Sequence, residues 1–582
     1  MSQPPAPDAV PGPGTDPNHG QTPGAPATTR FFGSQVGGES VINYGYTDMP
    51  MKLLMWDMRS FLTYVWFLPW IVWPLTPHDS GDFDELAFNR ANAWCIFVHI
   101  ILIFLQLGFI IALPFTLLFP LWIDVLAITL FFLVNWALCL LLNGKTTTMY
   151  SDPKYASEED HPHEQWIFLN GVAVGEAWLT SNINRLALTF RRPIIGVHNR
   201  TTGILFDVVE CLIQRNFGYA TGDVREAYKV VKDKLYNPQY TKVVFILHSQ
   251  GGIEGGLVLD WLLQELPQDL LAKLEVYTFG NAANHFNNPH LHIRAQEEQQ
   301  QHCVTLRQHH AESLPLTESP VELKSSSPTT SKLADLGMTS NNKSKNDTDS
   351  RKQSTRHAIP ASDRVIGHVE HYAHTTDFVA LWGVLHFATA SMANRQLPRF
   401  IGRVFSRTSP RGGHQFCQHY LDGMFPLERD PHGGKNDFLG CADTNEFMES
   451  IVEDAVPSPN AATIKPEPAR PVEGNPKVDT AAPSATPAPD TDTFDLREDI
   501  ATSFAMLLPD RTVLLPTADD AEVQFHSGGS FHERYHSLLP SGKPVRVKDL
   551  SRLWLYRNGK SPADVPRYAE IGADGVARGR TM

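Results

Sequence analysis

The sequence predicts an α/β protein, in which a mostly parallel sheet with helices on both faces follows a pair of long apolar helices. Three stretches carry this prediction. Residues 164–288 alternate short apolar runs with helical patterns, as chains do when helices connect parallel strands. Within them, Val243–Leu247 is a β-branched and aromatic run of the kind buried on both faces of a sheet. Residues 94–142 contain one charged side chain, that of Asp124.

The first 90 residues divide into two regions of different composition. Residues 1–45 are rich in Pro, Gly, Thr and Ala and poor in apolar side chains, so we predict disorder. They show no basic segment followed by an apolar core, as a signal peptide would. Residues 46–90 hold the Trp-rich run Phe61–Leu75, which is short for a membrane span and is broken by Pro69. We predict that this region lies at a membrane interface, with a buried arm of the soluble domain as the alternative.

Residues 91–145 are predicted to form a transmembrane helix pair. Its halves lie near 94–119 and 121–142, and a span of about 20 residues in each matches a hydrocarbon core of about 30 Å. Pro114 and Pro120 mark the turn. By the positive-inside rule, both ends of the pair face the cytosol, with the turn on the far side or embedded. Basic residues flank the pair and are absent from its connection: Lys52, Arg59, Arg90 and Lys145.

The rest of the chain is predicted to contain one main folded domain. Residues 160–435 form the α/β domain, which is interrupted at 294–359 by a polar insertion that we predict to be disordered. Residues 436–495 are predicted to be a Pro/Ala-rich linker. The fold of residues 496–582 is left open between a small module and a tail docked on the core. The net charge of −14 disfavours a nucleic-acid partner, and the six scattered cysteines show no metal-binding spacing.

The run Val243–Leu247 is followed by one serine, two glycines and a helical pattern. Ser249 precedes Gly251 and Gly252, after which leucines recur at mostly helical spacing. A strand, a sharp turn with one serine and a helix indicate a nucleophile elbow, in which the turn lifts the hydroxyl clear of the sheet. Leu247 holds the position that is usually small in Gly-x-Ser-x-Gly. Either a neighbouring glycine makes room for it or the elbow is relaxed and inactive, and a plain β–α turn is the simpler alternative.

A serine hydroxyl becomes a good nucleophile when a histidine takes its proton and a carboxylate orients that histidine. On an elbow, the three residues follow in the order Ser, acid, His. Asp377 fits the acid because it follows the strand-like run Val365–Tyr372. Glu370 is the alternative acid, although it lies within that run. An ordinary loop aspartate that caps the next turn is the simpler interpretation of Asp377.

Two histidines are candidates for the base. His414 follows two glycines, beyond the strand-like run Phe400–Phe405, where a loop between the last strand and the last helix is expected. His419 lies about one turn further on and is the alternative base, although a packed core histidine is the simpler interpretation. His248, beside Ser249, is predicted to be structural.

The oxyanion of an acyl-transfer intermediate needs two backbone N–H donors near the serine. We expect one from Gln250, which directly follows Ser249. We expect the other from Val172, which follows the Asn170-Gly171 turn after an apolar run.

Four motifs together resemble the lipase and serine-esterase branch of the α/β-hydrolase superfamily: Leu247–Gly252, Thr278–Ala283, the loop of Asp377, and Gly412–His414. They are most similar to membrane-anchored fungal members. The resemblance covers about residues 164–427, apart from the insertion. It implies the α/β-hydrolase fold, a Ser-Asp-His triad that works through an acyl-enzyme, and neither a metal nor an organic cofactor.

Two functions remain open from the sequence. The first is a membrane-anchored serine hydrolase that cleaves a lipid or another hydrophobic acyl ester, with its anchor holding the site where such substrates partition. We expect such a protein in an intracellular membrane, such as the endoplasmic reticulum, with its catalytic domain facing the cytosol. The second is a catalytically inactive membrane scaffold of the same fold, which Leu247 and the long polar segments favour.

Overall fold

The computed structural model describes the following residues: 28–32, 35–36, 49–75, 79–156, 161–289, 364–389, 400–409, 411–434, 436–454 and 545–562. They fold around a nine-stranded sheet whose order is β13-β1-β10-β8-β7-β6-β4-β5-β3. The six strands from β10 to β5 are mutually parallel, while β3 and β1 run antiparallel to β5 and β10. The predicted α/β class with a mostly parallel sheet is therefore confirmed.

The strands of this sheet are short and, in its centre, buried along their whole length. Because both faces are covered, β6 is a continuous apolar run rather than an alternating one. The strands are β1 (Thr28–Phe32), β3 (Thr148–Tyr150), β4 (Glu164–Leu169), β5 (Ile194–Val197), β6 (Lys242–His248), β7 (Leu274–Phe279), β8 (His368–His374), β10 (Arg403–Arg407) and β13 (Ile451–Asp454). Two small pairs lie apart from it: β2 (Gln35–Val36) with β9 (Phe400–Ile401), and β11 (Leu427–Arg429) with β12 (Phe438–Cys441).

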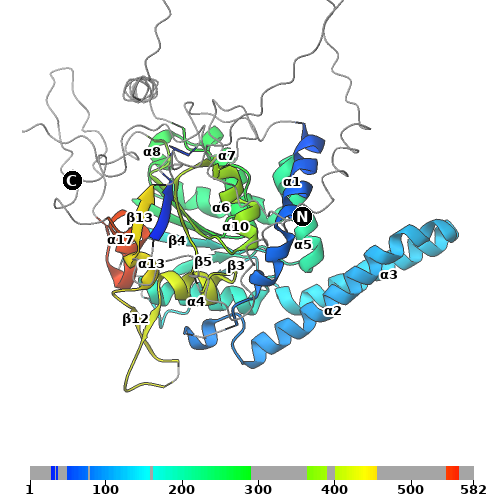
Figure 1. The fold of residues 1–582 in the computed structure, drawn as a ribbon, viewed down its shortest axis with the longest axis horizontal. Coiled ribbons are helices and arrows are strands. Elements are labelled where there is room, and N and C mark those ends of the chain that lie inside the picture. The colour runs from blue at the N-terminus through cyan, green and yellow to red at the C-terminus, as the bar shows by residue number, and fades with distance from the viewer. Residues whose placement is uncertain are drawn as a thin grey trace, which may run out of the picture.

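Helices cover both faces of the sheet (Figure 1). Trp166 and Phe168 of β4 point into the core of one face, and Ile167 and Leu169 into the core of the other. The first face is covered by α4 (Glu176–Phe190), η6 (Phe416–Leu421), α12 (Asp422–Met424), α13 (Glu446–Glu449), α17 (Val547–Leu550) and η7 (Leu553–Gly559). The second is covered by α1 (Pro50–Tyr64), η2 (Val65–Ile71), α5 (Ile204–Phe217), α6 (Gly222–Tyr236), α7 (Gln250–Glu265), α8 (Gln268–Leu271), α10 (Phe378–Trp382) and α11 (Val384–Thr389).

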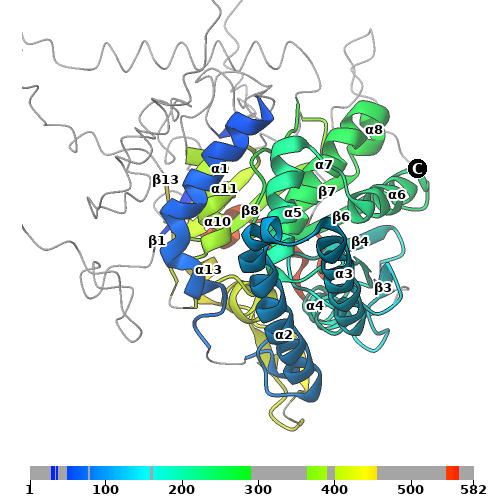
Figure 2. The same ribbon diagram turned by 90° about the vertical axis from the view of Figure 1, so that its right-hand side faces the viewer.

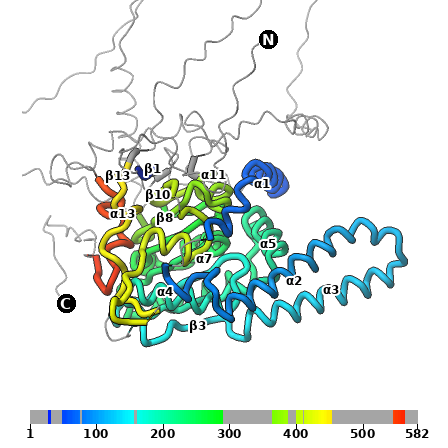
Figure 3. The backbone as a smooth tube through the Cα atoms, turned by 60° about the horizontal axis from the view of Figure 1, so that its bottom comes forward, coloured from blue at the N-terminus to red at the C-terminus, as the bar shows by residue number. Residues whose placement is uncertain are grey.

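Two long apolar helices project from this body as a rod (Figures 1 and 3). The rod consists of α2 (Arg90–Ala112), η4 (Leu113–Leu118) and α3 (Leu121–Asn143). Its helices pack on each other, and the rings of Phe109 and Phe131 stack with centroids 3.9 Å apart. Both helices are long and apolar enough to cross a membrane by length and composition.

Part of the predicted N-terminal disorder is wrong, because residues 28–32 form strand β1. Phe31 is buried, and its ring lies 5.2 Å from that of Phe405 on the neighbouring strand β10. Thr29 and Phe31 are buried and Arg30 between them is exposed, as in a strand near the edge of a sheet. Because the surrounding sequence is rich in Pro and Gly, its average composition hides this short strand. Apart from these residues and 35–36, the range 1–45 lies outside the described residues, as does the predicted insertion at 294–359.

The predicted boundary of the C-terminal linker is also wrong. Residues 436–454 are ordered and form β12, α13 and β13. Further on, residues 545–562 dock on the core, where Arg552 forms an ion pair of 2.8 Å with the buried Glu275 of β7. Tyr556 donates a second hydrogen bond to this carboxylate, at 2.8 Å. These contacts hold the segment in place, because a buried carboxylate needs charged or hydrogen-bonding partners. For residues 545–562, the structure therefore shows a tail docked on the core.

Candidate active site

Ser249 sits on a strained turn between β6 and α7. Its backbone has φ 58° and ψ −123°, which is a costly conformation for a residue with a side chain. The turn closes because the neighbouring backbones approach it closely. A Cβ on Gly251 would lie 2.6 Å from the carbonyl oxygen of Leu169, and one on Gly171 would overlap Ser249 itself. The geometry is that of a tight elbow that presents the hydroxyl at the carboxyl end of a central strand.

Leu247 fits beneath this turn because Gly255 makes room for it. A Cβ on Gly255 would overlap the Cδ1 atom of Leu247. Of the two alternatives that the sequence leaves open, accommodation by a nearby glycine is therefore the one found. The relaxed elbow is not found, since Ser249 keeps its strained backbone.

The structure brings Ser249, His414 and Asp377 into one hydrogen-bonded chain. The Nε2 atom of His414 lies 2.9 Å from the Oγ atom of Ser249. The Nδ1 atom of His414 lies 3.0 Å from the Oδ2 atom of Asp377. All three side chains are buried. In this order the imidazole can accept the serine proton while the carboxylate orients and stabilises the resulting imidazolium.

Asp377 is held as a carboxylate by several donors. Burial raises its pKa, but the charge and hydrogen bond of His414, followed by the Tyr420 hydroxyl, bring the pKa below its ordinary value. The Tyr420 hydroxyl donates to Oδ2 at 2.6 Å, and the backbone N–H of Val379 donates to Oδ1 at 2.8 Å. Asp377 is thus both the cap of α10 and the partner of His414, so the two interpretations of this residue are compatible.

The alternative residues have other partners. Glu370 accepts hydrogen bonds from Tyr372 and from the backbone of Arg552, and it pairs with His368 within the core of β8. His419 uses both ring nitrogens on backbone atoms, with its Nε2 atom 2.9 Å from the carbonyl oxygen of Pro74. Burial lowers the pKa of His419 to about 4, so it is neutral.

His248 supports the loop that carries His414. Its Nε2 atom lies 2.9 Å from the carbonyl oxygen of His414, and the two rings stack with centroids 4.8 Å apart. Burial lowers the pKa of His248 to about 3. Because the ring of His248 is neutral, it does not compete with a protonated His414 for the negative charge of Asp377.

The residues expected to form an oxyanion hole flank the serine. Gln250 is the first residue of α7, where backbone N–H groups lack partners within the helix. Val172 lies next to Gly171, whose position against Ser249 brings this loop over the hydroxyl. The N-terminal end of α7 also carries partial positive charge, which favours an oxyanion.

A network of amide side chains fixes these two backbone segments, and the sequence reasoning missed it. Asn199 donates to the side chain of Gln250 at 2.9 Å, and Asn170 donates to the backbone carbonyl of Asn199 at 2.8 Å. Asn170 directly follows strand β4, and Asn199 lies two residues after the end of the neighbouring parallel strand β5. The position of the two asparagines just beyond these strands could have indicated the network, since side chains at the carboxyl ends of neighbouring parallel strands meet at one edge of the sheet.

The loop after Val172 is pinned from two directions. Ala173 has a φ of 64°, which is uncommon for a residue other than glycine. Its N–H donates to Asp207 of α5 at 3.0 Å, and its carbonyl oxygen lies 2.8 Å from the Nε2 atom of His99 in α2. The rod therefore holds the loop that is expected to supply an oxyanion donor. The sequence around His99 is apolar and does not indicate that its partner is a backbone carbonyl of this loop.

Comparisons of the chain with protein-family models, curated proteins and solved structures find no match. Within the described ranges, no group of three or more His, Cys, Asp or Glu side chains is arranged to hold a metal ion. The function must therefore be argued from the chemistry of the Ser249, His414 and Asp377 chain.

Proposed function

We propose that this protein is a serine hydrolase of the α/β-hydrolase type, which cleaves a lipid or another hydrophobic acyl ester. The observation that carries the proposal is the chain of hydrogen bonds from Ser249 through His414 to Asp377 on a strained elbow. The order of these residues in the sequence, with the serine between a central strand and a helix, is that of the α/β-hydrolases.

The proposed reaction begins with a proton transfer. His414 takes the proton of Ser249 through Nε2 as the serine oxygen forms a bond to the carbonyl carbon of the ester. The negative oxygen of the tetrahedral intermediate faces the backbone N–H groups of Gln250 and Val172. When the intermediate collapses, the alkoxide leaves and takes the proton from His414. Water then attacks the acyl-enzyme by the same route and releases the acid.

The preference for a hydrophobic substrate rests on what covers the site. The segment of η2 and the residues after it lies against the chain that follows His414. Gln415 donates to the carbonyl oxygen of Ile71 at 3.0 Å, and the Nε2 atom of His419 in η6 lies 2.9 Å from the carbonyl oxygen of Pro74. Trp66 and Trp73 of this segment are exposed. A substrate that reaches the serine past this segment meets indole rings, which favour the interface between lipid and water.

The membrane is the proposed location of such a substrate. The rod offers apolar surface of a length suited to lipid, so we propose membrane anchoring in an intracellular membrane such as the endoplasmic reticulum. The basic residues that flank the rod favour a body on the cytosolic side. The partners are then the lipid ester and the bilayer, without a nucleic acid.

Hydrolysis of a short p-nitrophenyl ester by the purified protein in detergent tests the proposed chemistry without a natural substrate. We expect turnover by the wild-type protein and its loss in Ser249→Ala. A folded wild-type protein that does not hydrolyse such esters would favour the alternative of an inactive membrane scaffold.

A further inference from the structure

The helix α1 exposes an apolar stripe and buries two polar side chains. Met51, Met55, Met58 and Leu62 recur at helical spacing, and all are exposed. The helix buries Asp57 and Ser60 together with Leu53 and Tyr64, whereas a surface helix of a soluble protein keeps its large apolar side chains on the buried face. The exposed face also carries Lys52 and Arg59, and an apolar stripe with basic side chains is the pattern of a helix that lies on a membrane surface.

The neighbouring helix α5 extends this surface. The Nε atom of Arg215 in α5 donates to Asp57 of α1 at 2.6 Å, and this buried ion pair holds the two helices together. On its outer side α5 exposes Val209, Ile213 and Phe217, which are spaced four residues apart. Figure 2 shows α1 and α5 on the side of the body from which the rod projects. We call α1, η2, α5 and the projecting part of the rod the membrane-facing surface.

The base of the rod is docked on the body by a polar stripe. Asn92, His99 and Gln106 are spaced seven residues apart in α2 and are buried. Gln106 donates to the carbonyl oxygen of Thr202 at 2.8 Å and to the side chain of Asn135 in α3 at 2.9 Å. The stripe ends there, and just beyond it the rings of Phe109, Phe131 and Phe132 still contact Phe206 of α5.

Beyond the stripe lies the distal half of the rod, residues 107–134. Its exposed residues include consecutive ones, such as Phe132–Val134, so apolar side chains point outward on more than one face. Leu117 at the tip is 90% exposed. From Asn135 back to Leu121, α3 extends about 21 Å at the rise of an α-helix. This is less than the about 30 Å of a hydrocarbon core, but more than the about 15 Å of one leaflet.

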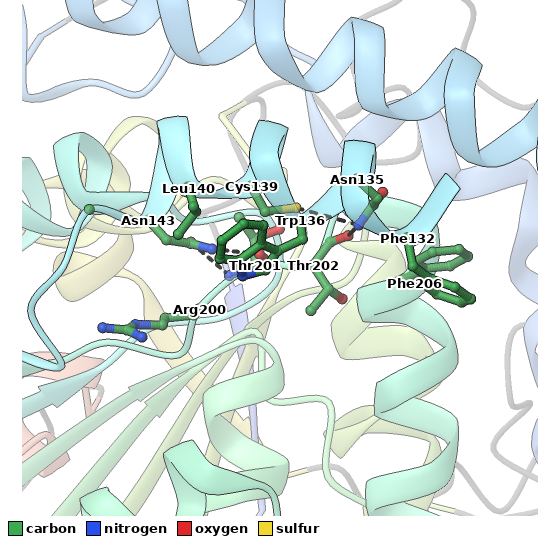
Figure 4. Close-up of a pocket in the computed structure, with 11 residues that line it drawn as sticks. Phe132, Asn135, Trp136, Cys139, Leu140, Asn143, Arg200, Thr201, Thr202 and Phe206 are labelled. Atoms are coloured by element: carbon green, nitrogen blue, oxygen red, sulfur yellow. Dashed lines mark hydrogen bonds between the residues drawn. The ribbon is translucent and has the colours of Figure 1, made fainter. Parts of the chain in front are cut away.

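Cationic and apolar groups meet at the base of the rod. A groove of about 520 Å³ lies between α3 and the loop after β5, and Phe132, Trp136 and Leu140 form its apolar side (Figure 4). Arg200 lies at its other end and donates to the carbonyl oxygen of Lys145 at 2.7 Å. A cation beside an aromatic, apolar groove matches the boundary between headgroups and acyl chains.

We propose that the membrane-facing surface binds one leaflet of a lipid bilayer, and that the distal half of the rod ends near the bilayer midplane without crossing it. The inference rests on the membrane anchoring within the proposed function. The turn at 113–120 carries no charged residue, as suits a tip that stays in lipid. Asp124 is the only Asp, Glu, Lys or Arg in the distal half, and it lies in the first turn of α3, where free N–H groups favour a carboxylate.

Cysteine labelling from the two sides of a membrane tests this insertion depth. The full chain carries Cys303→Ser, because the other five cysteines are buried and Cys303 lies outside the described residues. Leu118→Cys is then added at the tip. A bulky, membrane-impermeant maleimide is then applied under three conditions. It is added to sealed microsomes, to microsomes whose lumen has been opened by a pore-forming agent, and to microsomes dissolved in detergent. We expect labelling of the tip to stay at background until detergent is added.

The matched control is Thr146→Cys, an exposed position just after α3 on the side of the body. We expect it to react in intact microsomes. Labelling of the Leu118→Cys tip once the lumen is opened would show that the rod crosses the bilayer and would overturn the proposal. Tip labelling in intact microsomes, or release of the protein by carbonate, would show that the anchor itself is wrong. Ester hydrolysis in detergent is measured separately, so a failed anchor and a failed hydrolase can be told apart.

Discussion

The elbow and the distal half of the rod are both apolar runs, yet the protein covers one and leaves the other bare. Every residue from Lys242 to Leu259 is buried, whereas most residues of the distal half are exposed. Two features make the difference. Glycines after Ser249 let α7 pack closely on the sheet, while the polar stripe of α2 docks only the base of the rod. The placement of glycines and amides therefore decides which apolar segment the body covers.

The largest expected effect concerns the serine and the base. Ser249→Ala, His414→Ala and the double variant should each lose on the order of 10⁴–10⁶ in kcat on a p-nitrophenyl ester, because the residues of such a unit do not contribute additively. His419→Gln is the control, since both ring nitrogens of His419 are hydrogen-bonded to backbone atoms rather than to Ser249 or Asp377. If folded His414→Ala protein kept normal turnover and His419→Gln lost it, the base would be His419 and not His414.

A smaller effect, on stability, is expected where Leu247 packs on Gly255. Gly255→Ala should lower the free energy of unfolding by about 1–3 kcal/mol, because its Cβ overlaps Leu247. In a Leu247→Ala background the same change should cost less, which gives a coupling of about 0.5–3 kcal/mol in a urea-unfolding cycle. Gly222→Ala serves as the control, because its added Cβ meets nothing within 4 Å. Additive effects of Leu247→Ala and Gly255→Ala would mean that the glycine does not accommodate the leucine.

A comparable or smaller loss is expected at the docked end of the rod. Gln106→Leu keeps the helix apolar but removes the hydrogen bonds to Thr202 and Asn135, so it should lower the free energy of unfolding by about 1–3 kcal/mol. Leu107→Gln, on the exposed side, is the matched control and should leave the melting temperature nearly unchanged in detergent. Equal melting temperatures for wild type and Gln106→Leu would show that the stripe does not hold the rod.

The smallest expected effect depends on pH and lies on α5, between the two regions. Burial, together with the charges of Asp207 and Asp223, raises the pKa of Glu210 to about 7. A carboxyl with a raised folded-state pKa contributes stability at low pH, and this is lost as the pH rises through about 7. Glu210→Gln should therefore raise the melting temperature by a few degrees at pH 8 and change it little at pH 5. The opposite pH dependence in thermal unfolding would contradict this.

The sequence was informative where structure follows from local order. A strand, Ser249, two glycines and a helix are contiguous, so the elbow could be predicted from them. Asp377 and His414 could be placed because each follows a strand-like run in the expected order. In the rod, the seven-residue spacing of Asn92, His99 and Gln106 was the overlooked signal for its docked face.

Other contacts left no local trace in the sequence. His99 binds a backbone carbonyl of the Val172 loop, and nothing in its neighbours indicates that target. Arg552 reaches Glu275 across 277 residues of chain, so only the fold reveals the pair. Strand β1 is five residues within a Pro/Gly-rich region, and it forms because the sheet has an edge to receive it.

The most direct test of the central claim is the site of covalent labelling by a fluorophosphonate. Such a probe reacts with a serine whose proton is removed by a neighbouring base, and mass spectrometry of the digested protein locates the adduct. We expect one adduct on Ser249, formed by the wild-type protein and lost in both Ser249→Ala and His414→Ala. A folded wild-type protein that remains unlabelled, or that carries its adduct on another serine, would contradict the proposed triad.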